Sequence, residues 1–180
     1  MNHEKELKEI VKGLKGNIMA LGLDSKLVLE EIEKNKQIEN YLLLDCIEVM
    51  PIDGKKRRNK KIPLKKLRKK VGKKRIDTVI CRLSSIDKYF KYFIRDSIYM
   101  TKHEIIYYGK KDELTIDKEE FIKRYQRYKN VDVKFHNTKD GMMIYVKVNG
   151  AKNHMILDLF YFVRDSFYNA VQLFGDYLVQ

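Results

Sequence analysis

The 180-residue sequence contains no tryptophan, two prolines and two cysteines. Cys46 and Cys81 cannot build a disulfide framework, and alone they cannot supply the four ligands of a structural zinc site. Apolar runs are only a few residues long, against the roughly 20 residues that a membrane helix needs, so we expect no membrane span. The four histidines have neither i, i+4 nor zinc-finger spacing, and we expect no metal site. They are His3, His103, His136 and His154.

Several enzyme signatures are absent as well. The sequence has no phosphate-binding loop, no serine nucleophile elbow and no kinase motif. Neither cysteine stands in a motif with a histidine, which a cysteine nucleophile needs. These absences exclude the enzyme classes that depend on such motifs, and no catalytic residue can be named from the sequence.

The composition favours one folded domain. Hydrophobic residues make up 44% and charged residues 35%, which is enough apolar material for a core and argues against wholesale disorder. No proline- or glycine-rich linker divides the chain. We therefore expect a single domain spanning residues 1–180, in the cytoplasm.

The positive charge is concentrated in one place. The formal net charge is +13, and residues 55–75, KKRRNKKIPLKKLRKKVGKKR, hold 14 basic residues and no acid. The remaining 159 residues hold 24 basic and 25 acidic residues and are therefore close to neutral. Such a density of like charge favours a polyanion as partner. A solvated lysine-rich loop, an anionic membrane surface and a nuclear-import signal are the alternatives.

We expect this basic segment to bind the phosphate backbone of RNA or DNA. Its candidate contacts are Lys55, Lys56, Arg57, Arg58, Lys60, Lys61, Lys65, Lys66, Arg68, Lys69, Lys70, Lys73, Lys74 and Arg75. Pro63 suits the first position of a helix, and Leu64, Leu67 and Val71 follow at i, i+3 and i+7 spacing. The pattern predicts a short helix that docks this apolar stripe on the domain, turns its lysines outward and ends at Gly72.

The rest of the chain alternates between patterns typical of helices and of strands. Apolar runs predict strands near 17–22, 41–46, 76–81 and 104–108, and the Asp-Gly pair at 140–141 predicts a hairpin at 131–148. Helical spacing predicts helices over 3–15, 26–35, 84–100 and from Thr115 or Asp117 to 129, with a last aromatic helix over 156–180. This order predicts an α/β fold with a mainly parallel, Rossmann-like sheet, followed by a C-terminal hairpin.

Most of the sequence resembles the class I S-adenosylmethionine-dependent methyltransferases. Ile18-Met19-Ala20-Leu21-Gly22-Leu23-Asp24-Ser25 is similar to the strand and glycine turn with which that family begins, and Asp45 follows Gly22 by 23 residues. Ile76-Asp77-Thr78-Val79-Ile80 resembles the family's fourth strand, and a terminal hairpin is a further family trait. The resemblance covers roughly residues 5–150.

The resemblance implies a site for S-adenosylmethionine. Gly22, Leu23, Asp24 and Ser25 would approach the cofactor, and Asp45 would accept hydrogen bonds from its ribose hydroxyls. The motif is degenerate, because it holds a single glycine and places a leucine side chain where backbone should approach a ligand. Cys81 to Ser85 also replace the acidic and proline-aromatic residues frequent after the fourth strand. The resemblance therefore leaves two possibilities, either a methyltransferase acting on nucleic acid or a relative without a working cofactor site.

A different class of function is also compatible with the sequence. Residues 156–179 are apolar on nearly every side of the expected helix, which is more than one face can hide on a small sheet. The alternative is therefore a non-enzymatic interaction or structural protein that forms a homodimer through this C-terminal aromatic helix.

Overall fold

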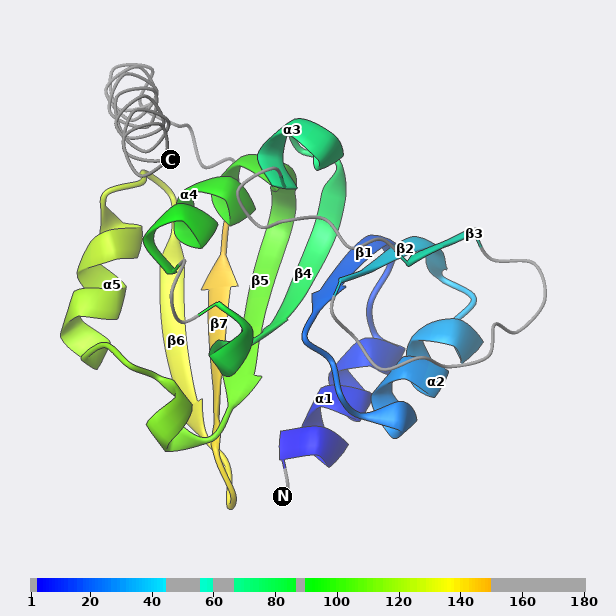
Figure 1. The fold of residues 1–180 in the computed structure, drawn as a ribbon, viewed down its shortest axis with the longest axis horizontal. Coiled ribbons are helices and arrows are strands. Elements are labelled where there is room, and N and C mark those ends of the chain that lie inside the picture. Colours follow the sequence, from blue (N-terminus) through cyan, green and yellow to red (C-terminus); the bar gives the residue numbers. More distant parts are fainter. Residues whose placement is uncertain (1–2, 45–55, 60–66, 87–89, 150–180) are drawn as a thin grey trace, which may run out of the picture.

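The computed structural model describes residues 3–44, 56–59, 67–86 and 90–149. They form a seven-stranded sheet in the order β3-β2-β1-β4-β5-β7-β6, with helices on both faces (Figure 1). The strands are β1 (Gly16–Leu21), β2 (Ile38–Leu44), β3 (Lys56–Asn59), β4 (Ile76–Arg82), β5 (Thr101–Gly109), β6 (Asp132–Asn137) and β7 (Met142–Lys147).

The first five strands in this order are parallel, and β7 is the strand that runs in the opposite direction. β3, β2, β1, β4 and β5 run in one direction, β7 pairs antiparallel with β5, and β6 pairs antiparallel with β7. The parallel strands therefore share two edges of the sheet. We call the edge at which they begin the amino edge and the edge at which they end the carboxyl edge.

Helices cover both faces of this sheet. α1 (His3–Lys12) and α2 (Lys26–Lys34) pack on one face, while α3 (Leu67–Val71), α4 (Phe90–Met100) and α5 (Lys118–Gln126) pack on the other. Two 3-10 turns, η2 (Leu83–Ser85) and η4 (Lys111–Glu113), follow β4 and β5. Ser25 and Asp117 cap α2 and α5 by accepting hydrogen bonds from backbone N–H groups.

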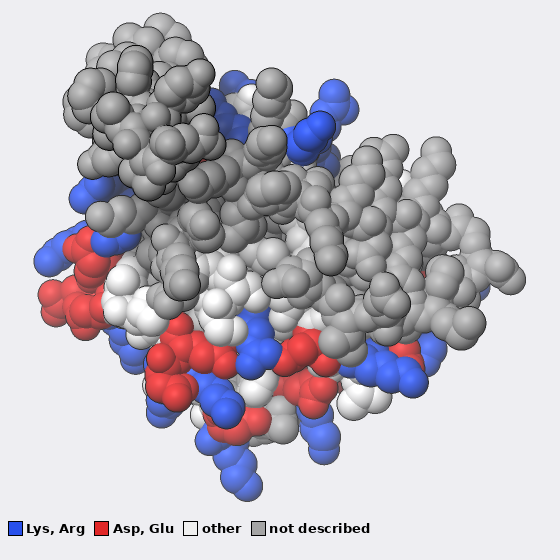
Figure 2. All heavy atoms as spheres, viewed as in Figure 1, with Lys and Arg blue, Asp and Glu red and all other residues white. Residues whose placement is uncertain are grey.

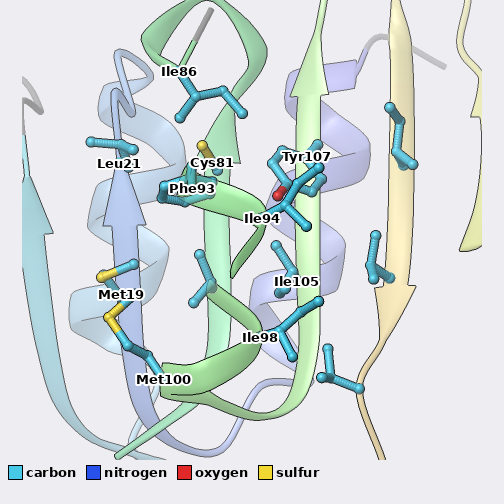
Figure 3. Packing of buried hydrophobic residues seen from close by; sticks show 14 of the residues in the cluster. Met19, Leu21, Cys81, Ile86, Phe93, Ile94, Ile98, Met100, Ile105 and Tyr107 are labelled. Atoms are coloured by element: carbon cyan, nitrogen blue, oxygen red, sulfur yellow. The ribbon is translucent and has the colours of Figure 1, made fainter. Parts of the chain in front are cut away.

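The strands are buried on both faces, so neighbouring residues of one strand belong to different cores. In β1, Met19 and Leu21 face the helices α3 to α5, whereas Ile18 and Ala20 face α1 and α2. Figure 3 shows the first of these cores, with Phe93, Ile94, Ile98 and Met100 of α4 lying over the strands. The continuous apolar runs that predicted the strands reflect this burial.

Most of the expected elements are confirmed. β1, β2, β4 and β5 occupy the four regions predicted as strands, and β6 and β7 form the predicted hairpin. The helix expected after Asp117 is α5, which ends at Gln126. The predicted aromatic helix at 156–180 lies outside the described residues.

Two expectations need correction. Residues 56–59 form the edge strand β3, which is paired parallel with β2, although no strand was expected there. Such pairing uses backbone groups only, and charged residues are common on the edge strands of sheets. The sequence of this strand therefore has no apolar pattern from which it could be predicted. The helix expected over 84–100 does not begin at Ser84, because Ser84 and Ser85 lie in the 3-10 turn η2; α4 is described from Phe90 onward.

Candidate functional site at the carboxyl edge

The turn after β1 is hydrogen-bonded to β2 and to β5. Gly22 has a positive φ of 67°, a conformation that favours glycine. Its N–H donates to the carbonyl of Leu44 at 2.9 Å, and its carbonyl accepts from the hydroxyl of Tyr108 at 3.1 Å. Both backbone polar groups of Gly22 therefore have partners within the protein.

The outer face of this glycine is covered by the segment that follows β4. A β-carbon on residue 22 would overlap the hydroxyl oxygen of Ser85. A ligand that contacted this face of Gly22 would have to move Ser85. Leu23, in contrast, is no obstacle, because its side chain is fully buried among the residues beneath α1 and α2. The expected steric obstacle at Leu23 is therefore wrong, since the side chain points into the core.

Three charged side chains close the carboxyl edge from β1 to β5. The guanidinium of Arg82, at the end of β4, forms ion pairs with Asp24 after β1 and with Glu113 in η4. The Nη2–Glu113 Oε1 distance is 2.9 Å, and Nε also donates to this carboxylate at 3.4 Å. Burial alone would raise the pKa of Glu113, but the hydrogen bonds and charge of Arg82 lower it. The same hydrogen bond to Glu113 raises the pKa of Arg82.

The start of α1 lies against the same edge. Ser25 donates to the carboxylate of Glu4 and also caps α2 through the N–H of Val28. His3 stacks on the ring of Tyr108 with a centroid distance of 6.2 Å. Its backbone N–H donates to Asp140 in the hairpin turn at 2.9 Å. The polar groups of this corner are thus bonded to one another.

The structure brings together four of the five residues that the resemblance assigns to S-adenosylmethionine. Gly22, Leu23, Asp24 and Ser25 form one turn, whereas Asp45 lies outside the described residues. In this arrangement the described residues do not fit the cofactor. Ser85 covers Gly22, and Arg82 forms an ion pair with Asp24. The hydroxyl of Ser25 is hydrogen-bonded to Glu4 and to the first turn of α2. Sequence reasoning missed Arg82, Ser85 and Glu113. Arg82 and Ser85 stand in the segment that follows the predicted strand 76–81, which was the available signal for them; the sequence offered none for Glu113.

Residues 67–75 of the basic segment lie away from this site, because they comprise α3 and the turn into β4 and are therefore at the amino edge. Residues 56–59 form β3, whose last residue, Asn59, is paired with Leu43 near the carboxyl end of β2. Leu67 is buried and Val71 packs against the core, which confirms the inward stripe at these two positions. Gly72, with a φ of 91°, ends α3. Leu64 and the cations at 55, 60, 61, 65 and 66 lie outside the described residues.

Among the described cations of the segment, Lys74 and Arg68 contact groups within the protein. The ammonium of Lys74 donates to the carbonyls of Ile98 and Thr101, at 2.9 and 2.7 Å, and burial lowers its pKa. The guanidinium of Arg68 lies 4.2 Å from the centre of the Tyr99 ring. Lys70, Lys73 and Arg75 are exposed.

Neither a metal centre nor a membrane helix is found in the part of the chain that the structure describes. No three His, Cys, Asp or Glu side chains there converge on a position that could hold a metal ion. No helix among these residues has the length and apolar character to span a bilayer.

Comparison with known proteins shows similarity in three-dimensional structure but not in sequence. No protein-family model matches the chain, and no curated protein matches it in sequence. A SAM-dependent methyltransferase from Aquifex aeolicus superposes on 82% of this chain and 89% of its own, with 14% identity and a TM-score of 0.53. TrmK of M. capricolum, in complex with S-adenosyl-homocysteine, covers 86% of this chain and 71% of its own, with 12% identity and a TM-score of 0.54.

A third similar structure contains the cofactor itself. It is magnesium protoporphyrin IX methyltransferase from Synechocystis PCC 6803 with bound SAM, which covers 81% of this chain and 79% of its own, with 13% identity and a TM-score of 0.55. At such identities the likeness establishes the fold and not the activity. The protein therefore has the α/β fold of class I, S-adenosylmethionine-dependent methyltransferases.

Proposed function

We propose that this protein is a methyltransferase-like nucleic-acid-binding protein whose carboxyl edge is closed to S-adenosylmethionine. The fold supplies the scaffold, and the basic segment 55–75 supplies the affinity for phosphate. The observation that carries the proposal is the Asp24–Arg82–Glu113 network, together with Ser85 over Gly22.

The network disfavours cofactor binding for an energetic reason. A ligand at Gly22 must displace Ser85 and compete with Arg82 for Asp24. The side chain of Asp24 is 53% exposed, and an ion pair of this exposure contributes about 0–1 kcal/mol. The cofactor would have to offset this loss, and the displacement of Ser85, from its own binding energy.

Nucleic acid is the partner that the charge distribution favours. Fourteen cations in 21 residues exceed what one small anion can neutralise, whereas a phosphodiester chain supplies one charge per nucleotide. Lysine-rich contacts hold a backbone and do not read base edges, so we expect binding with little sequence preference.

Methyl transfer to nucleic acid is the second candidate function. It is favoured by the left-handed Gly22 at the end of β1, which is followed by an acid and a capped helix, and by the fold shared with cofactor-bound methyltransferases. Under this candidate Arg82 must release Asp24 when the cofactor enters.

Titration calorimetry separates the two candidates. We expect the wild type to show no heat with S-adenosylmethionine or S-adenosylhomocysteine at millimolar concentration, while fluorescence anisotropy shows binding of RNA or DNA at low salt. Cofactor binding by Arg82→Ala but not by the wild type would identify the network as the closing element. Arg124→Ala is the matched control, because Arg124 pairs with Glu120 on α5. Wild-type cofactor binding would contradict the closed site.

The homodimer through the C-terminal aromatic helix remains a separate prediction. The helix lies outside the described residues, and light scattering of the full chain tests it directly.

A further inference from the structure

We infer that nucleic acid lies across the amino edge of the sheet, on cations from several strands, and not at the carboxyl edge. The inference rests on the proposed nucleic-acid binding. It adds a location and three residues outside the basic segment: Lys15, Lys36 and Lys102.

Four neighbouring strands each have a cation within two residues of their first residue. Lys36 precedes β2, Lys15 precedes β1, Arg75 precedes β4, and Lys102 is the second residue of β5. β2, β1, β4 and β5 are consecutive in the sheet. Neighbouring strands lie about 4.8 Å apart, so these four positions form a row of about 15 Å. A row of this length suits a chain of phosphates better than a single anion.

The register of the strands keeps the row together. Gly16 is paired with Ile38, and its N–H donates to the carbonyl of Gln37, so Lys15 and Lys36 are neighbours. Ile76 is paired with Thr101, which places Arg75 beside the start of β5. Lys15, Lys36 and Arg75 are exposed, and the side chain of Lys102 is 39% exposed.

The basic segment joins this row at both of its described parts. The edge strand β3 begins at Lys56, which is paired with Asn40 near the start of β2. The exposed Lys70 and Lys73 lie on α3 and in the turn that leads to Arg75. Tertiary structure thus adds Lys15, Lys36 and Lys102, from three other places in the sequence, to the segment that sequence alone identified.

Acidic groups at this edge do not neutralise the positive charge of the four cations. The carboxylate of Asp77 accepts from the N–H of Asn17 at 2.7 Å and from Lys102 at 2.9 Å, so it is already used within the sheet. Lys102 has three ammonium hydrogens and keeps donors for a phosphate. Glu39 is the exposed acid of β2.

The carboxyl edge has a different character. Its cation Arg82 lies between two carboxylates in the Asp24–Arg82–Glu113 network, and the carboxylate of Asp140 lies nearby against His3. Figure 2 shows this contrast, with red and blue side chains mixed along the lower edge and blue ones around α3 at the top. β4 has seven residues and so separates the two edges by about 20 Å. Phosphates bound at the amino edge therefore do not reach Gly22 or Arg82.

A pair of charge-matched variants of the full chain tests this location. The amino-edge variant is Lys15→Gln, Lys36→Gln and Arg75→Gln; Lys102 is kept because it pairs with Asp77. The carboxyl-edge control is Lys26→Gln, Lys110→Gln and Lys139→Gln. All six side chains are exposed, and each variant removes three positive charges. Circular dichroism and thermal melting check that both variants fold.

The readout is anisotropy with fluorescein-labelled 20-nucleotide RNA and DNA across a range of salt. At about 0.1 M salt we expect the amino-edge variant to lose about 100- to 500-fold in affinity, with a salt slope reduced by about 2 to 3. The control should change less than about threefold. These two results together would support the amino edge.

Several outcomes would overturn the inference. Equal losses in the two variants would mean that only net charge matters, and a larger loss in the control would move the nucleic acid to the carboxyl edge. Unchanged binding by the amino-edge variant would leave residues 55–74 as the whole surface. Tighter binding of the wild type to anionic vesicles than to either nucleic acid would assign the row to a membrane. A wild type that binds neither RNA nor DNA would instead refute the proposed function itself, and the inference with it.

Discussion

The hydroxyl oxygen of Ser85 lies where a β-carbon of residue 22 would stand, so the segment after β4 packs directly on Gly22. Glycine is therefore required at position 22 for two reasons: the backbone φ of 67° and the contact with Ser85. We predict that Gly22→Ala lowers the free energy of unfolding by about 1–3 kcal/mol, measured by urea denaturation.

Two further variants test the cause of this loss. Ser85→Gly should recover part of it in a double-mutant cycle, because it removes the overlapping hydroxyl. Gly13→Ala is the control, since a β-carbon there meets only ordinary contact with the carbonyl of Ile10 at 3.5 Å. An equal loss in Gly13→Ala and Gly22→Ala would contradict the steric explanation.

We predict that Lys74 stabilises the fold and does not contribute to nucleic-acid binding. Its ammonium satisfies the carbonyls of Ile98 and Thr101 at the end of α4. Lys74→Met should lower the free energy of unfolding by about 1–3 kcal/mol, because two carbonyls lose a charged donor. The affinity for RNA should change less than twofold.

Lys73→Met is the neighbouring control, because Lys73 is exposed. It should leave stability unchanged and lower affinity by about fivefold at 0.1 M salt, the value for one lost phosphate contact. A larger loss of affinity in Lys74→Met than in Lys73→Met would restore Lys74 to the binding surface.

Asp77 should make stability depend on pH in the acid range. Burial alone would raise its pKa, but the N–H of Asn17 and the charges of Lys102 and His103 lower it. A carboxylate whose pKa is lowered on folding stabilises the protein above its ordinary pKa, and this stabilisation is lost as pH falls through the lower, folded value.

We therefore predict that Asp77→Asn costs about 1–2 kcal/mol at pH 7 and that the difference from the wild type shrinks progressively as pH falls below the ordinary carboxyl pKa. Urea midpoints measured across this range give the comparison. Glu119→Gln, at a carboxylate that is 81% exposed, should follow the wild type at every pH. A constant difference between Asp77→Asn and the wild type would exclude titration of this carboxylate as the cause.

The salt dependence of nucleic-acid binding should reveal how many cations take part. If about half of the 14 cations in the basic segment reach phosphates, the slope of log K against log salt is about −5 to −6. Between about 50 and 200 mM salt this corresponds to a loss of about three orders of magnitude in affinity. A slope near zero would exclude binding to the phosphate backbone.

Serine at six positions of the segment should weaken binding strongly while the domain stays folded. The positions are Lys55, Lys56, Arg57, Arg58, Lys60 and Lys61. Residues 56–59 form the edge strand β3, whose pairing with β2 uses backbone groups that serine also provides. Unchanged affinity in this variant would remove the segment from the binding surface.

The sequence by itself determined the α/β class and the main elements. Apolar runs mark β1, β2, β4 and β5, because strands buried on both faces need continuous apolar side chains. The Asp-Gly turn marks the hairpin, and Ser25 and Asp117 mark the starts of two helices. The sequence also located the concentration of positive charge and the turn at Gly22.

Only the tertiary structure decided what these features do. Leu23 looked like an obstacle to a ligand, but the turn rotates its side chain into the core. Arg82 meets Asp24, 58 residues earlier in the chain, because β1 and β4 are neighbours in the sheet, and sequence separation does not contain that information. The same pairing of distant strands places the residues that precede β4 at the amino edge, opposite the turn at Gly22. Strand order, which follows from long-range packing, thus separates the cations of residues 67–75 from the site that the family resemblance pointed to.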